Sequence, residues 1–128
     1  MMFSSIKTCP FCSGLLNGTR RIVKENVGFV VIEARFKVAD SHFLVLPRAH
    51  VQHEIGLRNR RLLNEVKDLM MEMRVERCIV HPRPFNSVEH FHVHGLSGDF
   101  VHAYRAWSHS GRPPFSLTLD HCIANASS

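Results

Sequence analysis

Alternating apolar and polar residues along the chain predict several short strands, each ended by turn-forming residues. The expected strands are residues 20–24, 28–32, 42–46, 77–80 and 89–94. Glu25 and Asn26 would form the turn between the first two strands, which then make a hairpin. Pro47 ends the third strand because its ring removes a ladder donor, and the glycines of residues 95–99 end the last. The pattern therefore predicts an antiparallel sheet of about five strands.

One stretch, residues 57–75, has apolar residues at helical spacing and predicts a long helix. The residues on its apolar face are Leu62, Val66, Leu69, Met70 and Met73. Methionine is flexible and fills irregular gaps, so these methionines are expected in the core.

The remaining segments are shorter. Residues 9–13 are expected to open a short N-terminal helix, and residues 115–125 fit either a strand or a terminal helix. The expected loops are residues 14–19, 37–41, 82–84 and 108–114. Together the segments predict an α+β fold in one domain, residues 1–128, with the sheet packed against the long helix and the short N-terminal helix.

Composition and charge narrow the function classes. Hydrophobic residues make up 45% and charged residues 21% of 128 residues, as in ordinary globular proteins. No apolar run approaches the ~20 residues of a membrane span or forms a secretory signal, so the cytoplasm or nucleus is expected. The net charge of +5 favours anionic ligands such as phosphates and would help nucleic acid approach.

The run His90-Phe91-His92-Val93-His94 is the most informative stretch. In a strand its three histidines line one face while Phe91 and Val93 face the core. Neighbouring histidines then lie ~7 Å apart and the row spans ~13 Å, too far for all three to share one ion easily. The row predicts a metal site or a catalytic imidazole rather than an exposed polar face, because imidazole is a poor choice for mere solubility.

Cys9-Pro10-Phe11-Cys12 supplies two soft ligands at the spacing used by zinc sites. Four-coordinate zinc needs two more ligands, and His50 and His90 are the candidates. The alternatives are a redox pair or two ordinary reduced thiols. The other two cysteines, at positions 78 and 122, lie among apolar residues and are expected to be buried.

A neutral histidine can attack phosphorus through one ring nitrogen if an acceptor holds the other. His92, in the middle of the row, is best placed for this. Asn86 and Ser87 lie just upstream and could donate hydrogen bonds to phosphate oxygens or a leaving group, or could simply form a turn. His42 begins a strand, where a lone histidine is usually structural. The histidines at positions 53, 102 and 109 belong to no pattern and are expected at the surface.

These residues resemble a known family. The run His90-Phe91-His92-Val93-His94-Gly95-Leu96 resembles the signature of the histidine-triad superfamily, although Gly95 stands at a usually apolar position. The Cys-x-x-Cys matches one near the start of many members. Residues 42–50, HFLVLPRAH, resemble the family's His-x-Leu-Val-x-Pro-Lys-x-His segment, with Arg48 for the usual lysine. Residues 81–88 are similar to the divergent third branch of histidine-triad nucleotide-binding proteins and to aprataxin-like domains.

The resemblance implies a histidine-triad-like fold, a homodimer, and hydrolysis or transfer at the α-phosphate of an AMP-type purine nucleotide. It implies that His92 is the nucleophile, with His94 and His42 assisting. It places Asn86 and Ser87 at positions that contact the phosphate and leaving group. The ligands of a structural zinc match Cys9, Cys12, His50 and His90.

One position departs from the family pattern. Members usually have an Asp eight residues before the histidine that corresponds to His42, binding the ribose hydroxyls; here that position is Ala34. Glu33 beside it could substitute, but strand alternation puts it on the opposite face unless a bulge intervenes.

Three functions remain open at this point. The first is a zinc-bearing phosphoramidate hydrolase acting on adenosine 5′-phosphoramidate or aminoacyl-type adenylates. The second is an aprataxin-like deadenylase of nucleic-acid ends, which the modest charge makes a weaker candidate. The third is a non-catalytic nucleotide-binding or scaffold protein.

Overall fold

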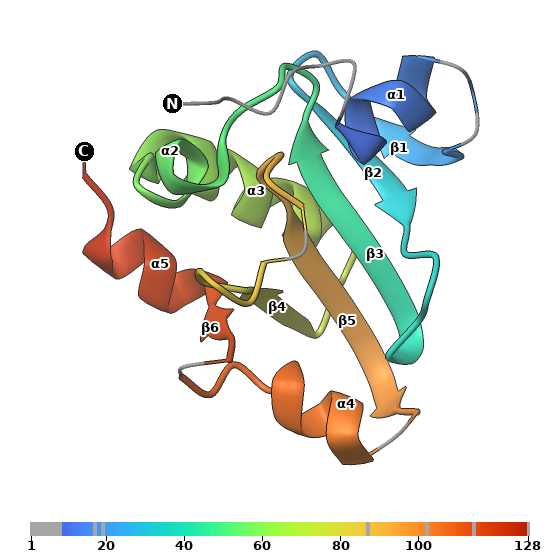
Figure 1. Ribbon diagram of the computed structural model, residues 1–128, viewed down its shortest axis with the longest axis vertical. Coiled ribbons are helices and arrows are strands. Elements are labelled where there is room, and N and C mark those ends of the chain that lie inside the picture. Colours follow the sequence, from blue (N-terminus) through green and yellow to red (C-terminus); the bar gives the residue numbers. More distant parts are fainter. Residues whose placement is uncertain are drawn as a thin grey trace.

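The computed structural model describes residues 9–16, 18, 20–86, 88–101, 103–113 and 115–127 (Figure 1). Its elements in chain order are α1 (Pro10–Leu16), β1 (Ile22–Glu25), β2 (Phe29–Glu33), β3 (Ala39–Pro47), α2 (His53–Leu57), α3 (Arg60–Glu72), β4 (Arg77–Val80), β5 (Val93–Phe100), α4 (Ala103–Ser108), β6 (Leu117–Thr118) and α5 (Leu119–Asn125).

The strands form one antiparallel sheet in the order β1-β2-β3-β5-β4-β6. This confirms the predicted α+β fold. The sheet has six strands because the segment that fitted either a strand or a helix contains both, the short β6 and then α5. At the centre of the sheet β3 pairs with β5, with Leu44 opposite His94. The central position buries the histidine strand on both faces.

The two faces of the sheet carry separate cores. On one face α3 and α5 pack against the sheet, and Leu63, Met70, Phe91 and Val93 belong to this core. Figure 1 shows α3 behind β3 and β5. On the other face Phe11 of α1 packs on the side chains of β2 and β3. Residues that alternate along the central strands therefore face either α3 or α1.

The predicted long helix is wrong at its N-terminal end, where the structure has two helices. The chain forms α2 from residue 53, turns at Arg58, and starts α3 at Arg60. Asn59 is the reason for the break, because it is extended and its side-chain oxygen accepts a hydrogen bond from the Leu62 amide at 3.0 Å. Such a cap satisfies a free amide at the start of a helix.

Two strands also differ from prediction. β3 begins at Ala39 instead of residue 42, within the segment expected to be a loop. The helix α1 differs too, since it continues to Leu16, into residues that were also expected to be a loop. β5 begins at Val93 and runs through Gly95 and Gly98, which were expected to end it. A Cβ at Gly95 would lie 2.8 Å from the Met70 sulfur, so the glycine lets α3 approach the sheet closely. Gly98 has a φ of +80° and continues the strand beside Asp40.

Candidate functional site

The histidine row is extended even though its first three residues precede β5. His90 pairs with Gln52 in an isolated bridge. Phe91 and Val93 are fully buried in the core beneath α3. His90, His92 and His94 lie on the other face, as alternation predicts, and all three are buried. The ring centroids of His92 and His94 are 5.2 Å apart.

His92 is held in one tautomer by the backbone. Its Nδ1 lies 2.9 Å from the carbonyl oxygen of His90, which can only accept, so Nδ1 carries the proton. The lone pair is then on Nε2. Burial lowers the pKa of His92 to about 4, so the ring is neutral near pH 7. A neutral imidazole with a free Nε2 lone pair is the form of histidine that acts as a nucleophile.

His94 is oriented by a second chain of hydrogen bonds. The amide of Val38 donates to Nδ1 of His42 at 3.2 Å, so His42 carries its proton on Nε2. That Nε2 lies 2.8 Å from Nδ1 of His94 and donates to it. His94 therefore carries its proton on Nε2, which is buried and has no hydrogen-bond partner among the described residues. Burial lowers the pKa of His42 to about 4 and that of His94 well below its ordinary value.

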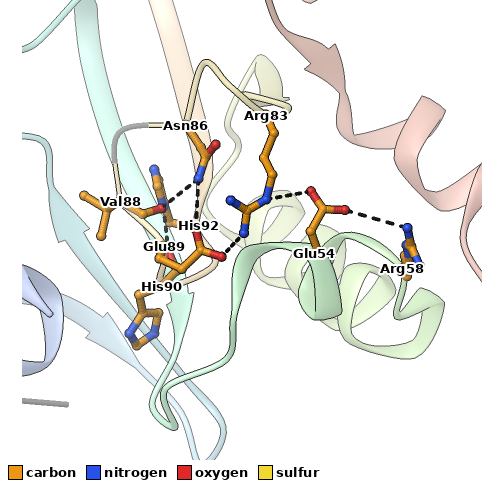
Figure 2. A network of polar contacts seen from close by, with 8 residues as sticks. All are labelled: Glu54, Arg58, Arg83, Asn86, Val88, Glu89, His90 and His92. Atoms are coloured by element: carbon orange, nitrogen blue, oxygen red, sulfur yellow. Dashed lines mark hydrogen bonds and ion pairs between the residues drawn. The ribbon is translucent and has the colours of Figure 1, made fainter. Parts of the chain in front are cut away.

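The loop before the histidine row borders a cavity of about 460 Å³. Its lining residues are Cys9, Pro10, Arg83, Pro84, Asn86, Val88 and Glu89. Arg83 bonds to Glu89 and lies 3.2 Å from a carboxylate oxygen of Glu54. Figure 2 shows this network continuing to Asn86, whose amide lies 3.5 Å from Glu89. The loop therefore presents an amide and a guanidinium around Glu89, the residue that precedes the first histidine. Ser87 lies outside the described residues.

Glu33 does not join the histidines. β2 and β3 pair in unbroken register from Phe29 to Glu33, so no bulge turns the Glu33 side chain. It lies opposite Phe43, on the face that carries α3, and forms an ion pair with Lys37 at 3.3 Å. Ala34 packs with the core on the histidine face. The predicted carboxylate substitute is therefore on the wrong side of the sheet for a ligand at His92.

Cys9, Cys12, His50 and His90 form a cluster whose ligand atoms all lie within 4.8 Å of one another, a group that could hold a metal ion. The Cys12 sulfur lies 3.4 Å from Nδ1 of both His50 and His90, and the Cys9 sulfur lies 3.6 Å from Nδ1 of His90. A tetrahedral zinc ion has sulfur–nitrogen edges of ~3.5 Å. The spacing is therefore that of one four-coordinate ion.

The cluster is also prepared by its surroundings. His90 donates its Nε2 proton to the carbonyl oxygen of Pro47 at 2.9 Å, which leaves the Nδ1 lone pair directed at the thiols. Burial, followed by the neighbouring Cys9, raises the pKa of Cys12 to about 11 in the metal-free chain. A cation would reverse that preference, because the thiolate is the form that binds metal.

Two histidines that sequence reasoning placed at the surface are buried. His53 is 1% and His109 is 7% exposed, so that prediction is wrong for both. His109 lies near His81 and His94, with ring centroids 4.4 and 5.4 Å away. No local pattern could have joined them, because α4 and a turn bring His109 back to the sheet. The third of these histidines, His102, lies outside the described residues. Of the other cysteines, Cys122 is buried and Cys78 is half-buried.

Within the described part of the chain, no helix is long and apolar enough to cross a membrane.

Comparisons with known proteins agree with this geometry. Residues 8–107 match the family described as "Scavenger mRNA decapping enzyme C-term binding". The chain is 24% identical over 120 residues to the bifunctional adenosine 5′-phosphosulfate phosphorylase/adenylylsulfatase HINT4 of Arabidopsis thaliana, covering 84% of this chain and 82% of that protein.

Two solved structures share the fold. A HIT family hydrolase from Clostridium thermocellum superposes with a TM-score of 0.62 at 19% identity, covering 74% of this chain and 94% of its own. Hnt3 in complex with DNA and guanosine superposes with a TM-score of 0.61 at 16% identity, covering 84% and 70%. The family match spans most of the chain and includes the whole histidine row. The chain belongs to the histidine-triad superfamily, in the scavenger mRNA decapping enzyme C-terminal family.

Proposed function

We propose that the chain hydrolyses adenosine 5′-phosphoramidate or adenylate-type substrates at the α-phosphate, through a nucleotidyl-histidine intermediate on His92. The observation that carries the proposal is the bond from Nδ1 of His92 to the carbonyl oxygen of His90, which leaves the nucleophilic lone pair on Nε2. That lone pair attacks phosphorus, a P–N bond forms, and the bond to the leaving group breaks.

The leaving group departs with the bonding electrons and accepts a hydrogen bond from the Nε2 proton of His94, which has no partner among the described residues. The leaving group takes up a proton from solvent, while the His92 ring, bonded to phosphorus through Nε2 and still protonated on Nδ1, becomes cationic. Water then attacks the intermediate, the P–N bond breaks, AMP leaves, the neutral His92 ring is restored and the proton released from the water goes to solvent. His42 is a positioning residue here, because its bond to Nδ1 keeps the proton of His94 on Nε2. Asn86 and Ser87 would donate to phosphate oxygens.

We propose further that the cysteine cluster holds a structural zinc ion. Two sulfur and two nitrogen donors are a set that structural zinc sites use, and the sulfur–nitrogen distances of 3.4, 3.4 and 3.6 Å match the edges of a zinc tetrahedron. Such an ion would fix α1 and residue 90 against the loop that follows β3. We also expect a homodimer, which sedimentation of the purified chain would measure.

The test is turnover of adenosine 5′-phosphoramidate, followed as release of AMP. His92→Ala should abolish turnover with the fold intact, whereas His121→Ala should retain it because His121 is exposed on α5. Rapid acid quench of the wild type should trap AMP covalently on His92. Full activity of His92→Ala would refute the mechanism. The absence of both turnover and trapped AMP would favour a non-catalytic nucleotide-binding protein.

The relatives suggest other substrates for the same assay. The HINT4 relative is named for adenosine 5′-phosphosulfate, so that compound should be compared with the phosphoramidate. A nucleic-acid deadenylase is the second candidate, favoured by the fold shared with a DNA-bound protein and by the net charge of +5. Faster release of AMP from adenylated nicked DNA than from the small substrates would select it.

A further inference from the structure

Three histidines from distant parts of the chain meet beside the catalytic row. His81 directly follows β4, His94 lies in β5, and His109 directly follows α4. Figure 1 shows α4 beside the C-terminal end of β5. Each of the three rings offers a nitrogen within 4.8 Å of the others, and none of these residues belongs to the cysteine cluster.

The arrangement of the rings is that of imidazoles around a shared centre. Their centroids are 4.8 Å apart for His81 and His94, 4.4 Å for His81 and His109, and 5.4 Å for His94 and His109. The interplanar angles are 76°, 88° and 84° in the same order. Three imidazoles bound to one zinc ion have centroids ~5 Å apart, given the usual zinc–nitrogen distance.

The Nδ1 atom of each ring is held by a neighbour. In His81 it lies 2.9 Å from the carbonyl oxygen of Phe115, and in His109 it lies 2.7 Å from the hydroxyl of Ser108. In His94 it is bonded to His42. The Nε2 atoms are therefore the ones that face inward, and those of His81 and His109 are 3.0 Å apart. Such outer contacts orient histidine ligands in metal sites.

We propose that His81, His94 and His109 form a second metal site, which takes a zinc-type divalent transition metal through three Nε2 atoms. Imidazole suits zinc, copper and nickel, and three histidines with one open position make a common zinc site. The Nε2 of His94 supports this assignment, since it is buried and unpartnered among the described residues.

The hydrogen bonds around His94 make this site weaker than the cysteine cluster. An ion on Nε2 must displace its proton, so His94 would have to donate from Nδ1 to His42. His42 would then carry its proton on Nδ1 and could no longer accept from the Val38 amide. Binding an ion at His94 therefore costs the buried hydrogen bond from the Val38 amide. The site of three histidines should consequently fill only after the cysteine cluster.

An ion on Nε2 of His94 would also remove the hydrogen-bond donor that the proposed reaction uses. Metal and nucleotide phosphate would compete for His94, so each should weaken the binding of the other. This consequence rests on the proposed function, whereas metal binding itself does not.

The direct test is equilibrium dialysis of the full chain against Zn²⁺ alone, with elemental analysis. The wild type should bind about two ions per chain at high Zn²⁺ and about one at low Zn²⁺. His81→Asn and His109→Gln should each bind about one at both concentrations. His121→Gln, an exposed substitution of the same kind, should still bind about two. A wild type that stops at one ion, or variants that keep the second, would overturn the site.

Two measurements on the unsubstituted chain keep the test decisive if the variants do not fold. Titration with Co²⁺ should give thiolate charge-transfer absorption with the first equivalent and only ligand-field bands with the second. The imidazole ¹⁵N signals of His81, His94 and His109 should shift with the second equivalent alone. Added thiolate absorption, or shifts at other histidines only, would overturn the assignment.

The competition is measured without turnover, as AMP affinity with one and with two metal equivalents. A weaker affinity with two supports His94 as a ligand, and an unchanged affinity contradicts it. If AMP does not bind under either condition, the proposed function fails while the dialysis result still decides the metal site.

Discussion

His42 and His94 share a buried hydrogen bond of 2.8 Å between Nε2 of the first and Nδ1 of the second. Because the Val38 amide occupies the other nitrogen of His42, the direction of that bond is fixed. The backbone amide of a single loop residue therefore decides which nitrogen of His94 carries a proton.

Replacing His42 should impair turnover more than substrate binding. His42→Phe removes the donor to His94, so its proton is no longer held on Nε2, and kcat should fall by about 10²-fold with little change in KM. His42→Gln can place an amide near the same position and should recover part of the rate. Equal losses in both variants would mean that the histidine acts by packing alone.

Glu33 should have no part in nucleotide binding. It faces the α3 side of the sheet and pairs with exposed Lys37. We expect Glu33→Gln to leave KM for the nucleotide substrate within about twofold, because the carboxylate lies on the face opposite His92. Its surface ion pair with Lys37 also contributes little to stability. A large rise in KM with unchanged stability would show that the sheet twists this carboxylate toward the ligand.

Removal of metal should destabilise the N-terminal part of the chain. Protein purified without added zinc should contain about one ion per chain, and dialysis against a chelator should lower the thermal midpoint. Cys12→Ser should reproduce the loss, whereas Cys78→Ala should keep the ion, since Cys78 lies across the sheet in the α3 core. A chelator without effect on stability would contradict a structural metal.

Gly56 should not tolerate a side chain. A Cβ at this position would lie 2.3 Å from the Phe91 ring, so Gly56→Ala should lower the free energy of unfolding by about 2 kcal/mol or more. This reverses the gain that alanine normally brings to a helix. Activity should fall as well, because Phe91 stands between His90 and His92. Gly28→Ala is the matched control, since a Cβ there meets nothing within 4 Å. Denaturant titration measures both variants.

Acid should destabilise the fold through buried histidines, and His53 offers a position outside both clusters to measure it. Burial lowers the pKa of His53 below 6.5, although Glu54 and Glu89 partly oppose this. Below pH 6.5 the unfolded chain therefore binds more protons than the folded one, so the free energy of unfolding decreases as the pH is lowered. One such group contributes up to about 1.4 kcal/mol per pH unit, and the contribution fades to almost nothing about one unit above 6.5, where both states are neutral.

His53→Leu should therefore make the fall in stability below pH 6.5 shallower, while the two proteins change alike above pH 7. The variant retains other histidines whose pKa is lowered by burial, so part of the slope should remain. An unchanged slope would mean that His53 becomes protonated in the folded state without cost. Urea unfolding at several pH values provides the comparison.

The sequence was most informative where local periodicity and local chemistry coincide. Alternation around His92 correctly separated the histidine face from the Phe91 face, and it also warned that Glu33 would point away. The break at Asn59 could not be seen, since a single cap residue competes with a continuous apolar face. Glycine in a strand pattern predicts a strand end, so the pattern stops β5 too early, whereas Gly95 is needed inside the strand for the approach of Met70.

The candidate site was predictable only where its residues are close in sequence or match the family. The position of His109 depends on how α4 returns to the sheet, and no spacing rule in the chain encodes that return. The same holds for the buried position of His53, which depends on the extra helix α2.

His90 takes part in both the cysteine cluster and the hydrogen bond that holds His92. Its imidazole points to the cysteines, while its carbonyl oxygen accepts a hydrogen bond from Nδ1 of His92. A disturbance at the thiols, such as oxidation or loss of an ion, would reach His92 through the backbone of one residue, His90. We therefore expect changes at the cysteines to alter how fast bound substrate reacts more than how tightly it is bound.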